Sequence, residues 1–174
     1  DLGKWISSLK LGPVPLYGHP ETLDWIKKKA PKNLLPHPVA PYAKEKIGDI
    51  SVAFLPVSHG VKPLATCGFL FEHKLFYASD MEAMEERGLA LIKGVKTAVI
   101  DGTFWDKQIL RGHMSAAQSL ELGERMNPQK LFLTQSGHTF PPFDIAARLF
   151  CKIVESENCA FSAQLAYDGL KIEI

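Results

Sequence analysis

The sequence predicts one α/β domain over residues 1–174. Short apolar runs rich in β-branched residues alternate with stretches of helical period, a pattern typical of layered α/β proteins. The length is sufficient for one hydrophobic core, and an apolar content of 46% with 22% charged residues is typical of a globular protein. The last elements indicate that the sheets are mixed.

The first half of the chain is predicted to be mostly strands. Pro13–Gly18 is a short strand, and Pro20 opens a helix to about Lys29, because proline fits the first helical position. The proline-rich stretch 31–41 predicts a loop. Further strands are predicted at Ile50–Val57, Cys67–Phe71 and Leu75–Ser79, with residues 72–74 as a turn.

The second half alternates helices and strands. Ser115 predicts the clearest helix start, because its side chain and Gln118 can form a capping box, and Asn127-Pro128 ends that helix. The other predicted elements are a helix at 81–93, a strand at 97–100, a strand at 131–134, a helix at 142–156 and a hairpin at 161–174.

Charge and cysteine content limit the partners. A net charge of +1 supports neither nucleic-acid nor membrane binding, and no apolar run approaches the roughly 20 residues of a membrane span. The start of the chain lacks the basic region of a signal peptide. Cys67, Cys151 and Cys159 are odd in number and lack metal-ligand spacing, so we expect buried thiols in a reducing cytoplasm. The expected partner is a small-molecule substrate, and the sequence leaves a homo-oligomer open.

Residues with metal-binding side chains follow successive apolar runs. His59 comes just after the predicted strand 50–57, and Asp80 lies 21 residues later at the end of another. His113 lies in a glycine-flanked loop, and Gln135 ends a further strand 22 residues beyond it. Imidazole and carboxylate at one sheet edge suit Zn²⁺, Mn²⁺ or iron. The alternatives are a core or capping role for His59, a helix N-cap for Asp80 and an exposed loop position for His113.

This series resembles the metallo-β-lactamase-fold hydrolases. It is most similar to the phosphodiesterases of that fold: the phosphonate-operon cyclic phosphodiesterases and the tRNA 3′-end endonucleases, with the pyrroloquinoline-quinone biosynthesis B-type proteins close by. The resemblance implies a four-layer αββα sandwich. It also implies that His59 and Asp80 are metal ligands and that His113 helps to protonate the leaving oxygen. Asp101 ends a predicted buried strand and must find partners, so we expect it either to support a ligand or His113 or to form a simple turn or cap.

The chain departs from the family pattern at two points. The His-x-His-x-Asp-His motif, which supplies most of the metal ligands, is absent, and the resemblance places it upstream of Asp1–Pro20. Gln135 stands where the family has a histidine ligand, and an amide is a weaker donor to zinc. His138, three residues on, is a candidate substitute. We therefore expect one or two Zn²⁺ or Mn²⁺ ions, bound weakly or not at all by this chain alone.

Two hypotheses from different classes follow. The first is a metal-dependent hydrolase in which metal-activated water attacks a phosphodiester-like substrate, since the sequence contains neither a Gly-x-Ser-x-Gly elbow nor a phosphate-binding P-loop. The second is a non-catalytic member of the fold that acts as a binding or assembly module. A third interpretation is that the chain is only part of an enzyme, whose metal-binding motif lies on a segment outside these 174 residues.

Overall fold

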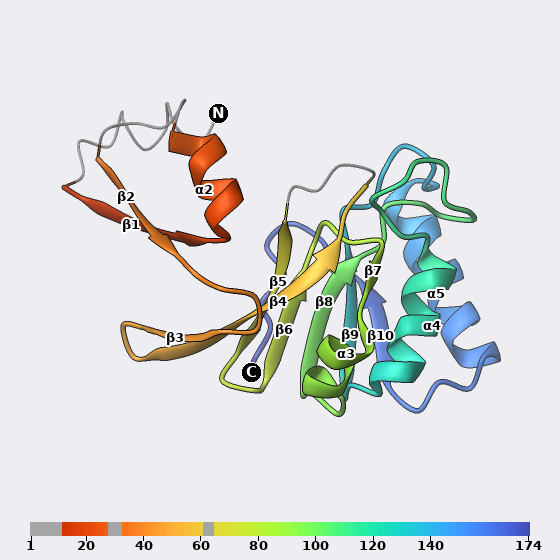
Figure 1. Cartoon of the computed structure of the whole chain (residues 1–174). Helices are drawn as coiled ribbons and strands as arrows, with labels where there is room; N and C mark the ends of the chain where they lie inside the picture. The colour runs from red at the N-terminus through yellow and green to blue at the C-terminus, as the bar shows by residue number, and fades with distance from the viewer. Residues whose placement is uncertain (1–11, 28–32, 61–64) are drawn as a thin grey trace.

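The computed structural model describes residues 12–27, 33–60 and 65–174, which form an α/β fold with two sheets and four helices (Figure 1). The α/β class predicted from the sequence is confirmed. Residues 1–11, 28–32 and 61–64 lie outside the described residues. The end of the predicted first helix, at 28–29, and the start of the predicted loop, at 31–32, fall among them.

The larger sheet is mixed, as predicted. Its eight strands are β3 (Lys44–Ile47), β4 (Ile50–Ser58), β5 (Thr66–Phe71), β6 (Leu75–Ala78), β7 (Ala83–Met84), β8 (Thr97–Asp101), β9 (Lys130–Thr134) and β10 (Ser162–Leu165). The order is β10-β9-β8-β6-β5-β4-β3, and β7 pairs with the end of β4. Strands β3 to β6 are antiparallel neighbours, whereas β6, β8, β9 and β10 are parallel.

This topology brings four strand ends to one edge of the sheet. Strand β4 runs in the same direction as β6, because each is antiparallel to β5 between them. Strands β8 and β9 are parallel to β6 and share that direction. The carboxyl ends of β4, β6, β8 and β9 therefore lie at the same edge, and the loops that follow them can build one site.

Three helices cover one face of the larger sheet. They are α3 (Glu86–Ile92), α4 (Ala116–Met126) and α5 (Phe143–Ser156). Their apolar faces and the alternate residues of β4, β6, β8 and β9 form one buried core that includes Leu55, Phe76, Ile100, Met126 and Phe150. Helix α4 begins with the predicted capping box: the Ser115 hydroxyl accepts the Gln118 amide at 3.3 Å, and Gln118 Oε1 accepts the Ser115 amide at 2.8 Å.

A smaller unit packs against the opposite face. Strands β1 (Val14–Gly18) and β2 (Leu34–Pro38) form a parallel two-stranded sheet next to α2 (Pro20–Lys27) (Figure 1). Tyr17 of β1 packs against the buried cluster of Val39, Val52 and Phe54. The predicted loop at 31–41 is wrong for its central part, which is strand β2. Proline is tolerated there because a two-stranded sheet leaves one side of each strand unpaired.

Two other predicted elements are corrected. The helix expected at 81–93 begins only at Glu86, because residues 83–84 first pair with the end of β4 as β7. The expected hairpin at 161–174 has its first strand, β10, and a turn closed by Leu170 N–H to the Tyr167 carbonyl at 3.0 Å, but no return strand. Residues 170–174 form no strand and pair with none of the described strands, although 171–173 line one pocket together with residues of β9 and β10.

No helix among the described residues is long and apolar enough to cross a membrane. The expectation that all three cysteines are buried is wrong for Cys151, which is exposed on α5, whereas Cys67 and Cys159 are half-buried. Cys151 follows the fully buried Phe150, and the helical turn of about 100° per residue rotates the next side chain toward solvent.

Candidate metal centre

His59 lies directly after β4 and is half-buried. Its Nδ1 is 2.7 Å from the Gly112 carbonyl oxygen. A carbonyl only accepts hydrogen bonds, so Nδ1 carries the proton and Nε2 is left with its lone pair. Metal-binding histidines usually have this arrangement, in which one ring nitrogen is fixed by a neighbour and the other faces the ion.

Asp80 follows β6 and is also half-buried. Its Oδ2 accepts the Ser79 hydroxyl at 2.9 Å. The alternative role as a helix N-cap does not apply, because α3 begins six residues later with Glu85 at its N-cap position. The carboxylate is therefore available for another partner at the sheet edge.

His113 is held by a buried carboxylate. Its Nδ1 lies 2.6 Å from Oδ2 of Asp101, the last residue of β8, which is completely buried. Asp101 also accepts the backbone amides of Met81, Thr103 and Met114 at 2.9–3.2 Å and the Thr103 hydroxyl at 2.8 Å. Asp101 thus fixes the His113 ring and joins the segment after Asp80 to the loop that carries His113. The contact with His113 is compatible with a supporting role and the bonds from Thr103 with a turn, so the role of Asp101 stays a prediction.

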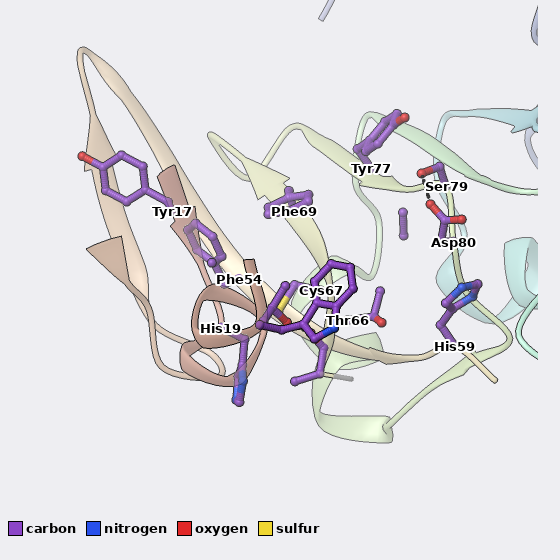
Figure 2. A pocket seen from close by; sticks show the side chains of 15 residues that line it. Tyr17, His19, Phe54, His59, Thr66, Cys67, Phe69, Tyr77, Ser79 and Asp80 are labelled. Carbon is purple, nitrogen blue, oxygen red and sulfur yellow. Dashed lines mark hydrogen bonds between the residues drawn. The ribbon is translucent and has the colours of Figure 1, made fainter. Parts of the chain in front are cut away.

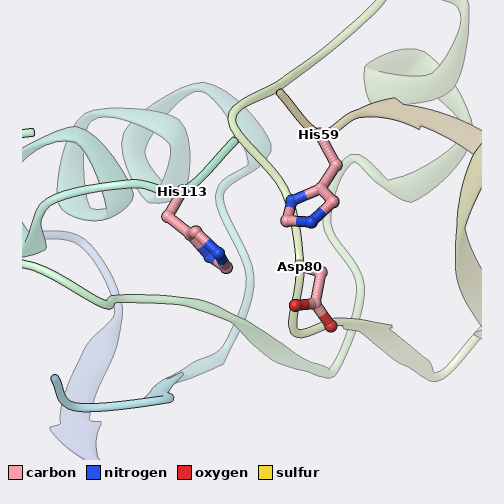
Figure 3. A group of neighbouring side chains, drawn as sticks. All are labelled: His59, Asp80 and His113. Atoms are coloured by element: carbon pink, nitrogen blue, oxygen red, sulfur yellow. The ribbon is translucent and has the colours of Figure 1, made fainter. Parts of the chain in front are cut away.

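His59, Asp80 and His113 converge at the sheet edge, as their positions after successive strands predicted (Figure 3). One ligand atom from each side chain lies within 4.8 Å of the other two. The imidazole rings are edge-on, with centroids 4.8 Å apart. Two imidazoles whose Nδ1 atoms are engaged and one carboxylate form a donor set suited to a divalent transition metal. The residues present therefore fit the metal that the fold implies.

Among the described His, Cys, Asp and Glu side chains, His138 does not join this group. Gln135 follows β9 with a left-handed φ of 64° and is exposed. His138 is exposed in the turn that follows. The turn does approach the site, because the Gly137 amide donates to the Thr103 carbonyl at 3.0 Å. A Cβ on Gly137 would lie 2.7 Å from that oxygen, so glycine is required for the close approach. The ligand roles predicted for Gln135 and His138 stay predictions.

A cavity of about 390 Å³ extends from this centre toward the smaller sheet (Figure 2). His59 and Asp80 lie at one end, and its walls include Trp25, Phe54 and Phe69. Cys67 also lines it, and burial raises the pKa of the Cys67 thiol. The cavity places largely aromatic surface beside the two predicted metal ligands.

The chain matches the family model described as Beta-lactamase superfamily domain over residues 6–134. It belongs to this superfamily. A search of curated proteins finds no match. Several solved structures are also similar to this chain. Their sequence identity is low enough that the similarity shows a shared fold and nothing more.

A diphosphatase of the PhnP family has a TM-score of 0.74 and 20% identity over 92% of this chain and 58% of its own. Zn²⁺-bound PqqB from Methylobacterium extorquens has a TM-score of 0.75 and 18% identity over 93% and 65%. YhfI from Bacillus subtilis has a TM-score of 0.70 and 19% identity over 90% and 63%. The chain thus spans less than two thirds of the length of these superfamily structures, and its recognition as a metallo-β-lactamase-fold protein is confirmed.

Several residues of the centre were not predicted. Gly112 orients His59 through its carbonyl, and Thr103 bridges Asp101 and His113, with its hydroxyl 3.2 Å from His113 Nδ1. Glu82 accepts the Gly112 amide. Of these residues, only Gly112 had a signal in the sequence, as the glycine directly before His113. Thr103 and Glu82 had none, because hydrogen bonds between distant loops leave no spacing pattern.

Proposed function

We propose that the protein is a metal-dependent hydrolase that cleaves a phosphodiester-like small substrate. Members of the superfamily are generally metal-dependent hydrolases. The choice of a phosphodiester as the substrate is our own inference. The observation that carries the proposal is the convergence of His59, Asp80 and His113 within 4.8 Å. Zn²⁺ or Mn²⁺ is the ion that we expect there.

The predicted roles agree with the contacts of each residue. His59 would hold the ion through Nε2, because the Gly112 carbonyl occupies Nδ1, and Asp80 would hold it through its carboxylate. When bound, such an ion activates water as a nucleophile near neutral pH and polarises the ester oxygen. Asp101 accepts a hydrogen bond from His113 Nδ1–H, so Nε2 is the atom that can pass a proton to the leaving oxygen.

The second candidate is a binding or assembly module without catalysis. Gln135 favours it, because the amide replaces the histidine that the family resemblance places after β9. Two proposed ligands, His59 and Asp80, are also few for a centre with two ions. The cavity beside the centre serves either function, so it does not distinguish them.

The test is hydrolysis of bis(4-nitrophenyl) phosphate by the natural gene product after EDTA treatment and return of Mn²⁺ or Zn²⁺. We expect turnover only with metal, and its loss in His59→Ala and Asp80→Ala. His73→Ala is the matched control, because His73 lies in the exposed turn between β5 and β6. Metal binding at His59 and Asp80 without hydrolysis of phosphodiesters would support the binding module.

A further inference from the structure

Glu82 lies where the three segments of the metal centre meet. It follows Asp80 by two residues and is half-buried. Its backbone amide donates to the carbonyl of Ser58, the residue before His59, at 2.7 Å. Its side chain reaches the loop that carries His113. One residue therefore contacts the chain beside each of the three converging side chains.

The Glu82 carboxylate has two donors on this loop. Oε2 accepts the Gly112 amide at 3.0 Å, and Oε1 accepts the Gln108 side-chain amide at 3.0 Å. The Gly112 carbonyl in turn accepts His59 Nδ1–H at 2.7 Å. A charged acceptor makes stronger hydrogen bonds than a neutral one, so the carboxylate is a firm anchor for the loop.

Gly112 is fitted tightly into this position. Its φ is +103°, and a Cβ would lie 2.8 Å from the Gly60 amide nitrogen and 3.1 Å from His59 Nδ1. The orientation of the His59 ring therefore depends on the placement of a backbone with little freedom to shift. Glu82 is the side chain that holds the amide of this same residue.

The tip of the loop has few other anchors. Asp106, Lys107, Ile109, Leu110 and Arg111 are exposed. The base of the loop is fixed by Asp101 at Thr103 and Met114. Between these two points, within the described residues, the side-chain hydrogen bonds of the loop involve Trp105, Gln108, Gly112 and His113. Glu82 accepts from two of these four, Gln108 and Gly112.

We propose that Glu82 is a positioning residue of the metal centre. It fixes Gly112 so that the Gly112 carbonyl orients His59, and it keeps His113 at the site through the adjoining backbone. This inference rests on the proposed metal-dependent function. Neighbours that orient metal-binding histidines commonly change metal affinity or activity by about 10–100-fold when mutated. Because Glu82 acts through Gly112, we expect the lower part of that range.

The test compares Glu82→Ala and Glu82→Gln in the natural gene product, with Glu85→Ala as the control. Glu85 accepts the Tyr42 hydroxyl at 2.8 Å, away from the loop. We expect Glu82→Ala to weaken Zn²⁺ binding about 10-fold in chelator competition. The His59 Nδ1–H resonance should broaden or disappear in NMR spectra. Glu82→Gln should recover part of both signals, because its amide oxygen can still accept the Gly112 amide.

The NMR signal separates this inference from the proposed function, since it requires neither hydrolysis nor metal. Loss of the resonance in Glu82→Ala without phosphodiesterase activity in the parent would support the positioning role and contradict the hydrolase. An unchanged resonance and a Zn²⁺ affinity within about twofold of the parent in folded Glu82→Ala would overturn the inference. The inference would also be overturned if Glu85→Ala changed the His59 resonance and the Zn²⁺ affinity as much as Glu82→Ala does.

Discussion

Replacing Asp101 by asparagine tests the buried hydrogen-bond network behind His113. The carboxylate accepts five hydrogen bonds, three at Oδ1 and two at Oδ2, and it is completely buried. An asparagine can present only one oxygen. We expect its NH₂ group to take the Oδ2 position, because fewer bonds are lost there.

The expected cost follows from the two bonds lost at Oδ2. The Met81 amide, which belongs to a fully buried residue, loses its acceptor. An orphaned buried amide costs about 1–3 kcal/mol, and a hydrogen bond to a charged group contributes about 1.5–3 kcal/mol. Because the chain relaxes around the new side chain, we expect the free energy of unfolding to fall by about 3 kcal/mol. His113 also loses the acceptor that fixes its ring, so turnover should fall as well.

Urea unfolding gives the stability change, and bis(4-nitrophenyl) phosphate turnover gives the activity change. Asp106→Asn is the matched control, because Asp106 is exposed on the same loop and should change stability by less than about 0.5 kcal/mol. A stability of Asp101→Asn within that same margin would refute the reasoning about the network. Lost stability with unchanged turnover would refute the link to His113.

Three further predictions concern the metal and the thiols. His113→Ala should lower turnover about 10²–10⁴-fold while metal content, measured by mass spectrometry, changes little, whereas equal losses would make His113 a ligand or a structural residue. Gln135→His should raise the metal stoichiometry toward two per chain; two tightly held ions in the parent, with His138 uncoordinated, would contradict the weakened-site interpretation. Iodoacetamide should label exposed Cys151 well before Cys67, since burial raises the pKa of the Cys67 thiol and lowers its thiolate fraction at neutral pH, and equal labelling rates would contradict this.

Local signals predicted much of the fold. The Ser115 capping box and the Asn127-Pro128 stop gave the bounds of α4, because both act within a few residues of the helix ends. The end of β4 before His59 was predicted from its apolar, β-branched run. These elements depend on neighbours in sequence, so a single chain is enough to recognise them.

Elements that depend on distant partners were missed. Strand β2 exists because it pairs with β1, and β7 exists because it pairs with the end of β4. The second strand of the hairpin predicted at 161–174 has no pairing partner in the part of the chain that the structure describes. Sequence periodicity indicates which face of a segment is apolar, and it does not indicate which strand lies beside it.

The centre shows the same division. The spacing of His59, Asp80 and His113 after successive strands predicted their convergence, because parallel strands end at a common edge. The roles of Glu82 and the Gly112 carbonyl depend on side chain–backbone contacts between loops that are far apart in sequence. Such contacts can be formed by many residue types, so they have no distinctive pattern.

The central claim is that a divalent ion bound by His59 and Asp80 drives hydrolysis beside His113. The most direct measurement is an anomalous difference map from crystals of the natural gene product grown with Zn²⁺. The account predicts a peak about 2.0–2.2 Å from His59 Nε2 and from an Asp80 carboxylate oxygen, with His113 facing it. A protein that hydrolyses the phosphodiester with its ion bound elsewhere, or that shows no peak between these side chains, would contradict the account.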